Sequence, residues 1–167
     1  MSDTTINGGA TSRRNFLTGA GLVAGSVGLT GAVGARASAS ELSMPGEDPE
    51  VSMVYQVNRD DPDYYGHILF SMGEILRQTA NNAALTAVCF GPGLNLLRAQ
   101  RSESVSAENH DRIASLMTYG ASFRACRQSM DAMDLAPEDL IDGVEVVPSG
   151  VLKMARLQQE GAAYVAW

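Results

Sequence analysis

The feature that most constrains the fold is a regular alternation of short apolar runs and longer amphipathic segments, which begins at Val51. Five short runs have the composition of strands, and they span residues 51–57, 84–90, 121–125, 144–147 and 162–166. The segments between them repeat apolar residues every three or four positions or carry helix-start signals. This alternation predicts one α/β domain with a mostly parallel five-stranded sheet and helices on both faces.

The predicted helices cover residues 63–81, 94–99 and 109–119, with one or two turns after Cys126 and a small helix start at residues 137–140. The last helix is expected to begin after Ser149, whose hydroxyl suits the N-cap position, and to run through Gln159. Its pattern predicts that Leu152 and Ala155 face the core, with Met154 or Leu157 as further inward-facing positions.

The first 39 residues have the three-part organisation of a secretory signal. A polar start leads to Arg13-Arg14-Asn15-Phe16-Leu17, which indicates the twin-arginine route for folded cargo. An uncharged segment follows at 18–34, and small-x-small cleavage patterns end at Ala37 and Ala39. The alternative is a retained membrane anchor, but this segment is glycine-rich and at the short limit for spanning a bilayer. We therefore expect cleavage near Ala37 or Ala39, a flexible leader at 40–50, a domain at 51–167 and a periplasmic location without a stable membrane anchor.

The charge of the predicted mature domain excludes some classes of partner. The chain has 12 basic and 19 acidic residues, and three arginines and one aspartate lie in the first 37 positions. The remainder therefore has 9 basic and 18 acidic residues. Because nucleic-acid binding depends on Lys and Arg contacts with phosphates, so acidic a domain is not expected to bind nucleic acid.

Metal and cofactor motifs are missing from the sequence. Two cysteines, Cys89 and Cys126, and two histidines, His67 and His110, are scattered without paired ligand spacing. The sequence also has no phosphate-loop lysine, dinucleotide fingerprint or Ser/His/Asp arrangement. We therefore expect neither a metal nor a cofactor.

Candidate site residues follow four of the predicted strands. They are Asn58 after the first, Gly91-Pro92-Gly93 after the second, Cys126 after the third and Ser149 after the fourth. Because ligands of open parallel sheets bind beyond the carboxyl ends of the strands, these residues are expected to converge on one pocket. The Gly-Pro-Gly segment could expose N–H groups to an anion or could simply form a tight turn.

Cys126 is the candidate reactive residue. It is predicted to lie where a strand gives way to a helix, and Arg124 and Arg127 flank it. Helix dipoles and guanidinium groups both favour a thiolate, although a small buried packing residue is an equally open interpretation. Cys89 lies inside an apolar run and is expected to be inert core. A Cys89–Cys126 disulfide formed after export is a third possibility.

Several segments together resemble the DsrE/DsrF-like proteins of sulfur oxidation and sulfur relay. The segment from Tyr119 to Cys126, followed by Ser129-Met130, is similar to that family's cysteine motif. Four further segments match in order, at residues 90–97, 135–140, 144–150 and 157–164.

The resemblance covers roughly residues 51–167 and implies a Rossmann-like three-layer α/β domain, often assembled as a trimer or hexamer. It also implies a cysteine that accepts sulfane sulfur as a persulfide and passes it on, and only Cys126 matches that position. The implied partners are a small sulfur donor and a sulfur-acceptor protein. The alternative is a binding or assembly module of the same fold in which Cys126 is structural.

Overall fold

The computed structural model describes residues 49–167, so the predicted signal peptide and most of the leader lie outside the described residues. The described chain forms five strands, β1 (Val51–Val57), β2 (Ala83–Cys89), β3 (Ser122–Cys126), β4 (Glu145–Val147) and β5 (Ala163–Val165). Its α-helices are α1 (Pro62–Gln78), α2 (Ala107–Thr118), α3 (Arg127–Ala132) and α4 (Gly150–Gln159). Two 3₁₀ helices, η1 (Gly91–Leu97) and η2 (Pro137–Asp139), complete the elements.

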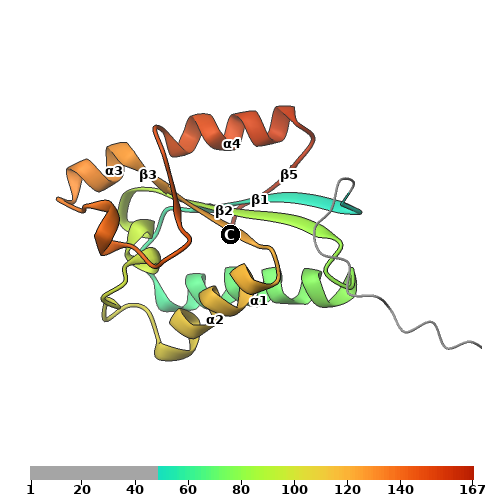
Figure 1. Cartoon of the computed structure of the whole chain (residues 1–167), viewed down its shortest axis with the longest axis horizontal. Coiled ribbons are helices and arrows are strands. Elements are labelled where there is room, and N and C mark those ends of the chain that lie inside the picture. Colours follow the sequence, from blue (N-terminus) through green and yellow to red (C-terminus); the bar gives the residue numbers. More distant parts are fainter. Residues whose placement is uncertain (1–48) are drawn as a thin grey trace, which may run out of the picture. The chain divides into compact units, whose positions relative to one another are not determined.

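The strands form one sheet in the order β4-β3-β2-β1-β5, and all four pairings are parallel. Helices α1 and α2 lie on one face of this sheet and α4 lies on the other (Figure 1). The predicted five-stranded α/β fold is therefore confirmed, and its sheet is entirely parallel. Among the described residues, no helix combines the length and the apolar character needed to cross a bilayer.

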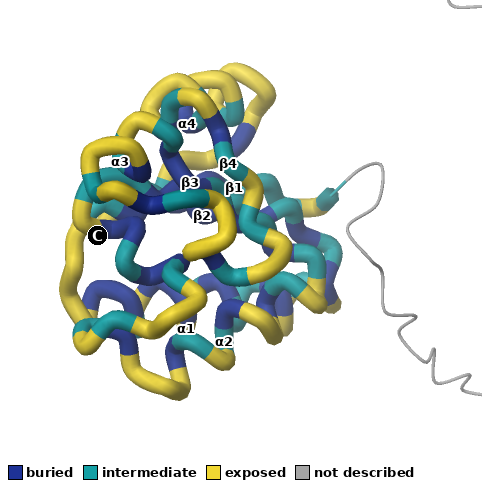
Figure 2. The backbone as a smooth tube through the Cα atoms, turned by 60° about the vertical axis from the view of Figure 1, so that its left-hand side comes forward, coloured by how far each residue is buried: buried dark blue, intermediate teal, exposed yellow. Residues whose placement is uncertain are grey.

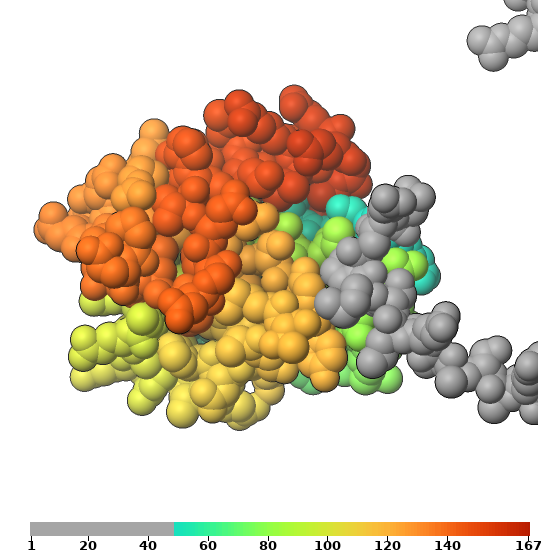
Figure 3. Space-filling model, viewed as in Figure 1, coloured from blue at the N-terminus to red at the C-terminus, as the bar shows by residue number. Residues whose placement is uncertain are grey.

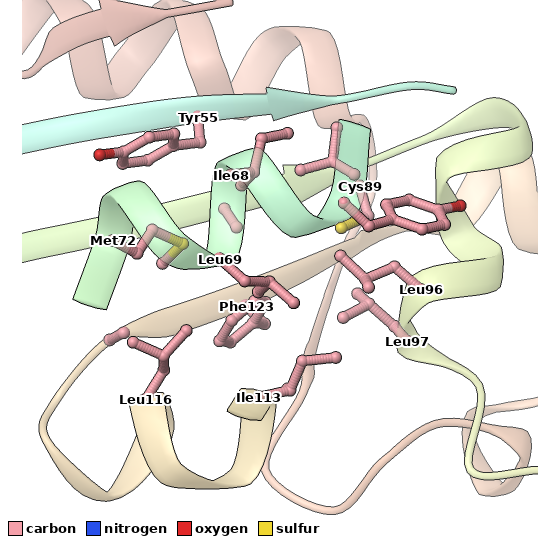
Figure 4. Close-up of a cluster of buried hydrophobic side chains, with 14 of the residues drawn as sticks. Tyr55, Ile68, Leu69, Met72, Cys89, Leu96, Leu97, Ile113, Leu116 and Phe123 are labelled. Carbon is pink, nitrogen blue, oxygen red and sulfur yellow. The ribbon is translucent and has the colours of Figure 1, made fainter. Parts of the chain in front are cut away.

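The larger core lies between the sheet and the pair α1 and α2. Phe123 and Tyr55 project from the strands toward Ile68 and Leu69 of α1 and toward α2 (Figure 4). A smaller core on the opposite face joins Val54 and Val88 to Met154 of α4 and to Ala162. Because one helix supplies most of the cover there, that face buries less apolar surface than the other.

The helix starts follow the capping chemistry of the sequence. Asp61 caps α1 by accepting a hydrogen bond from Tyr64 N at 2.8 Å, and Pro62 follows it at the first helical position. Ser106 caps α2 by accepting from Asn109 N at 3.0 Å. Ser149 caps α4 as predicted, accepting from Leu152 N at 3.4 Å.

Two local predictions were wrong. The helix predicted at 94–99 is a 3₁₀ helix that begins earlier, at Gly91, whose φ of 52° suits glycine in a tight turn. On α4 the buried residues are Gly150 and Met154, whereas Leu152 and Ala155, which were expected in the core, are exposed. Most of the α4 tube is exposed in Figure 2. A short helix on a thinly covered face presents only a narrow stripe to the sheet, so neighbouring apolar positions stay exposed.

Candidate functional site

The carboxyl ends of β1, β2 and β3 lie at one end of the sheet, where η1 and α3 also begin (Figure 1). Parallel pairing produces this arrangement, because all strands end at the same edge. Phe90 N donates to Val57 O at 3.0 Å and ties the end of β2 to that of β1. The Gly91–Gly93 turn and Cys126 both lie at this edge, as predicted.

Cys126 is the last residue of β3 and the residue that precedes α3. Its neighbour Ala125 packs in the larger core, so Cys126 points to the opposite face of the sheet, toward α4. The residue is buried, with 4% of its surface exposed. Its sulfur makes no close capping hydrogen bond to the first turn of α3. It is nevertheless surrounded by polar groups of two helix starts.

These polar groups lower the pKa of Cys126 below the usual thiol value. Burial alone would raise the pKa, but hydrogen bonds from the backbone N–H of Gly150 and from the hydroxyl of Ser129 outweigh it. The backbone N–H groups of Ser129 and Gln128 act in the same direction. We call these three residues, Gln128, Ser129 and Gly150, the thiol cradle. The cradle favours a thiolate, which is the nucleophilic form of cysteine.

Ser129 connects the cradle to the glycine turn. Its Oγ accepts a hydrogen bond from Gly91 N at 2.8 Å. Because the oxygen accepts from Gly91, its own proton is available to donate to the sulfur of Cys126. The predicted involvement of Gly91 in the site is therefore indirect: it orients the serine that contacts the sulfur.

Gly150 allows the start of α4 to approach the cysteine closely. A Cβ at this position would lie 3.2 Å from Cys126 Cβ, 3.3 Å from Val88 Cγ1 and 3.4 Å from Phe90 Cβ. Such contacts are tighter than ordinary van der Waals packing, so a side chain here would push α4 away from β3. Glycine at position 150 therefore keeps a backbone N–H close to the sulfur.

Cys89 has the opposite environment. It is fully buried in the larger core, and burial raises the pKa of its thiol. In the sheet register it pairs with Ala125 rather than Cys126. Since Ala125 and Cys126 point to opposite faces, the two sulfurs lie on opposite sides of the sheet, and both cysteines are free. The predicted core role of Cys89 fits this position, and the geometry opposes a disulfide.

The flanking arginines do not supply the electrostatics that the sequence suggested. Arg124 points to the same face as Cys126 but forms an ion pair with Glu145 of β4. Arg127 is the first residue of α3 and is half-buried. Neither guanidinium is among the largest influences on the pKa of Cys126, which are burial and the polar groups of the cradle.

The other predicted residues support the edge of the sheet. Asn58 lies beside Tyr64, whose hydroxyl donates to Gln56 O at 2.7 Å. Gly93 packs so closely on β1 that a Cβ there would lie 2.3 Å from Val57 O. Ser149 caps α4 and so precedes the cradle residue Gly150. Pro92 lines a hollow between η1 and α3.

Comparison with known proteins identifies the family. The sequence model of the DsrE/DsrF-like family matches residues 56–167. The chain belongs to the DsrE/DsrF-like family. This family is generally linked to sulfur relay. A comparison with curated proteins found no match.

Two solved structures share the fold. One is described as a protein of unknown function, MTH1491 from Methanobacterium thermoautotrophicum; it is 27% identical, with a TM-score of 0.57 over 70% of this chain and 98% of its own. The other is the ychN protein from E. coli, which is 19% identical, with a TM-score of 0.50 over 69% of this chain and 97% of its own. The DsrE-like matches agree with the parallel α/β architecture described above.

Sequence reasoning missed the thiol cradle. Gln128 and Ser129 follow Cys126 by two and three residues, where the first N–H groups of a helix are unpaired, and this spacing could have identified them. Gly150 comes from a different helix, and no local pattern brings it to Cys126. Among residues 49–167, no group of three or more His, Cys, Asp or Glu side chains is placed to hold a metal ion.

Proposed function

We propose that this chain is a sulfur carrier that accepts a sulfane sulfur on Cys126 as a persulfide and passes it on. The observation that carries the proposal is the thiol cradle, which directs hydrogen-bond donors from two helix starts and one hydroxyl at a single cysteine. Membership of a family linked to sulfur relay supports the same assignment.

The proposed chemistry is two thiol exchanges. In the first, the Cys126 thiolate attacks the outer sulfur of a donor R–S–SH; an S–S bond forms on Cys126 and the donor's S–S bond breaks, releasing R–S⁻. In the second, an acceptor thiolate takes that outer sulfur and leaves Cys126 as a thiolate. No external oxidant or reductant is needed. The cradle assists the first step by raising the thiolate fraction of Cys126, and the second by stabilising the negative charge that returns to its sulfur.

The proposed location is the periplasm, reached in folded form through the twin-arginine signal. The support is the Arg13-Arg14 motif, the uncharged segment that follows it and the cleavage patterns at Ala37 and Ala39. We also propose a homo-oligomer. Its support is the exposed apolar surface of α4 and β5, where Val151 is 62% exposed and Leu152, Tyr164 and Trp167 are also exposed.

A second candidate function is a binding or assembly module in which Cys126 only packs. The observation in its favour is the 4% exposure of Cys126, which is low for a residue that must meet a donor. The two functions differ in the chemistry of one sulfur atom, so a direct measurement separates them.

The test is to treat the full-length chain with inorganic polysulfide, trap persulfides by alkylation and map the added mass by peptide. A carrier gains one sulfur on Cys126, a Cys126→Ser variant gains none, and a Cys89→Ala variant gains the sulfur as the natural chain does. A Cys126 that stays unmodified in the folded protein would refute the proposal and favour the module.

A further inference from the structure

A hollow between η1 and α3 lies beside the thiol cradle. It has a volume of about 360 Å³ and is lined by Gly91, Pro92, Asn95, Gln128, Ser129, Ala132 and Met133. We call it the η1–α3 hollow. Figure 3 shows the surface at this end of the molecule, where the yellow-green segment after η1 lies below the orange segment that contains α3. Its size is within the range of small-ligand pockets.

The η1–α3 hollow is lined by two residues of the thiol cradle. Gln128 and Ser129 line the hollow, and polar groups of both also lower the pKa of Cys126. Gly91, on the opposite wall, donates to Ser129 Oγ at 2.8 Å. A donor seated in the hollow would therefore meet the same serine that holds the thiolate.

The lining of the η1–α3 hollow is uncharged. Among the described residues that form it, the side chains are apolar or neutral, and Pro92, Ala132 and Met133 supply carbon and thioether surface. An anionic group placed there would lose water without gaining a cationic partner. An uncharged organic group would bury apolar surface, and the polarizable Met133 sulfur adapts to irregular shapes.

A second hollow offers the opposite chemistry. It is lined by β4, the turn after it and α4, and its wall carries Lys153 and Arg156. Its only carboxylate, from Glu145, is already paired with Arg124. None of its lining residues donates to the Cys126 sulfur. An anionic donor would prefer this second hollow, whereas two of the three cradle residues, Gln128 and Ser129, line the η1–α3 hollow.

We infer that the η1–α3 hollow binds the organic group of the sulfur donor, and that the donor is a small persulfide R–S–SH in which R is uncharged and apolar. This inference rests on the proposed function. With R in the hollow, the Cys126 thiolate attacks the outer sulfur, the S–S bond of the donor breaks, and R–S⁻ leaves. The negative charge of the Cys126 thiolate is transferred to the released R–S⁻, so charge and atoms balance.

The test compares two donors that differ by one terminal sulfonate, propyl persulfide and 3-sulfonatopropyl persulfide, with the full-length chain. The initial rate of sulfur addition to Cys126 is measured for each by alkylation and peptide mass analysis. We expect the propyl donor to react at least about 10-fold faster, because burying the sulfonate charge in the hollow without a cationic partner costs free energy. The ratio of the two rates cancels effects on the reactivity of the thiol itself.

Two matched variants localise the selectivity. Ala132→Arg places a cation on the exposed wall of the hollow and should lower the propyl-to-sulfonatopropyl ratio several-fold, whereas Ala114→Arg on the exposed surface of α2 should leave the ratio unchanged. Equal rates for the two donors, or a faster sulfonated donor whose advantage Lys153→Ala removes, would overturn the inference while leaving the carrier function intact. Failure of both donors and of polysulfide to load Cys126 would refute the carrier function itself.

Discussion

Cys89 and Cys126 are the same residue type at the ends of neighbouring strands, yet they have opposite environments. Cys89 ends β2 on the face covered by α1 and α2, where it lies fully buried in the larger core. Cys126 ends β3 on the other face, where two helices begin and direct N–H groups toward it. The pKa is raised at Cys89 and lowered at Cys126. The face to which the side chain points, and not its distance from the sheet edge, decides which thiol has the lowered pKa.

The largest expected difference between the two cysteines is their rate of alkylation in the folded protein. Cys126 lies at the carboxyl edge of the sheet and has a lowered pKa, whereas Cys89 becomes accessible only when the core opens. Opening a core costs about 5 kcal/mol or more, so iodoacetamide should label Cys89 at least about 1000-fold more slowly than Cys126. Peptide mass analysis over time measures both rates in one sample. Comparable rates would show that the two environments are not distinct in solution.

Replacement by serine should affect stability differently at the two positions. Cys89→Ser places a hydroxyl among apolar side chains and should lower the free energy of unfolding by about 2 kcal/mol. Cys126→Ser places the hydroxyl among donors that it can accept from, so its cost should be below about 1 kcal/mol. Urea unfolding of the two variants beside the natural chain gives both values. A larger loss at Cys126 than at Cys89 would reverse the assignment of core and site.

The hydroxyl of Ser129 should account for part of the lowered pKa of Cys126. Ser129→Ala removes one donor to the thiolate and should raise that pKa toward the usual thiol value. The pH dependence of alkylation measures the change. Ser106→Ala is the matched control. The Ser106 hydroxyl also accepts a hydrogen bond from a backbone N–H, that of Asn109, but it caps α2 instead of contributing to the cradle. An equal pKa of Cys126 in the natural and Ser129→Ala proteins would show that the Ser129 hydroxyl does not stabilise the thiolate.

The smallest expected effect is an opposite pH dependence of stability at the two cysteines. In the folded protein the pKa of Cys126 is lowered relative to the unfolded thiol value of about 8.5. Its contribution to the free energy of unfolding is therefore present above about pH 8.5 and is lost as pH falls through the folded pKa. At Cys89 the folded pKa is raised, so its contribution is present below about pH 8.5 and declines as pH rises above it.

Urea unfolding between pH 6 and pH 9.5 checks these signs. The stability of the natural chain relative to Cys126→Ser should increase with pH across the interval below about 8.5, and its stability relative to Cys89→Ala should decrease above that value. The same sign at both positions would contradict the contrast between the two thiols.

Much of the fold could be predicted because the strands and helices differ in local pattern. The runs that became β1 and β2 are apolar and β-branched, and capping residues such as Ser149 identify the helix starts. The sequence also pointed to Cys126 through strand-end geometry. The sequence predicts that Arg124 and Arg127 favour a thiolate at Cys126, because local sequence brings them nearest. Glu145 instead pairs with Arg124, and Gly150 supplies a donor from a distant helix, so tertiary packing determines the electrostatics of the site.

The most direct test of this account is the pKa of Cys126 in the folded full-length chain, measured from the pH dependence of its alkylation in a Cys89→Ala background. The account predicts a value clearly below the free-thiol value of about 8.5, with Gly150→Ala shifting it upward as α4 moves away. A pKa at or above about 8.5 would contradict the account and would make Cys126 a packing residue like Cys89.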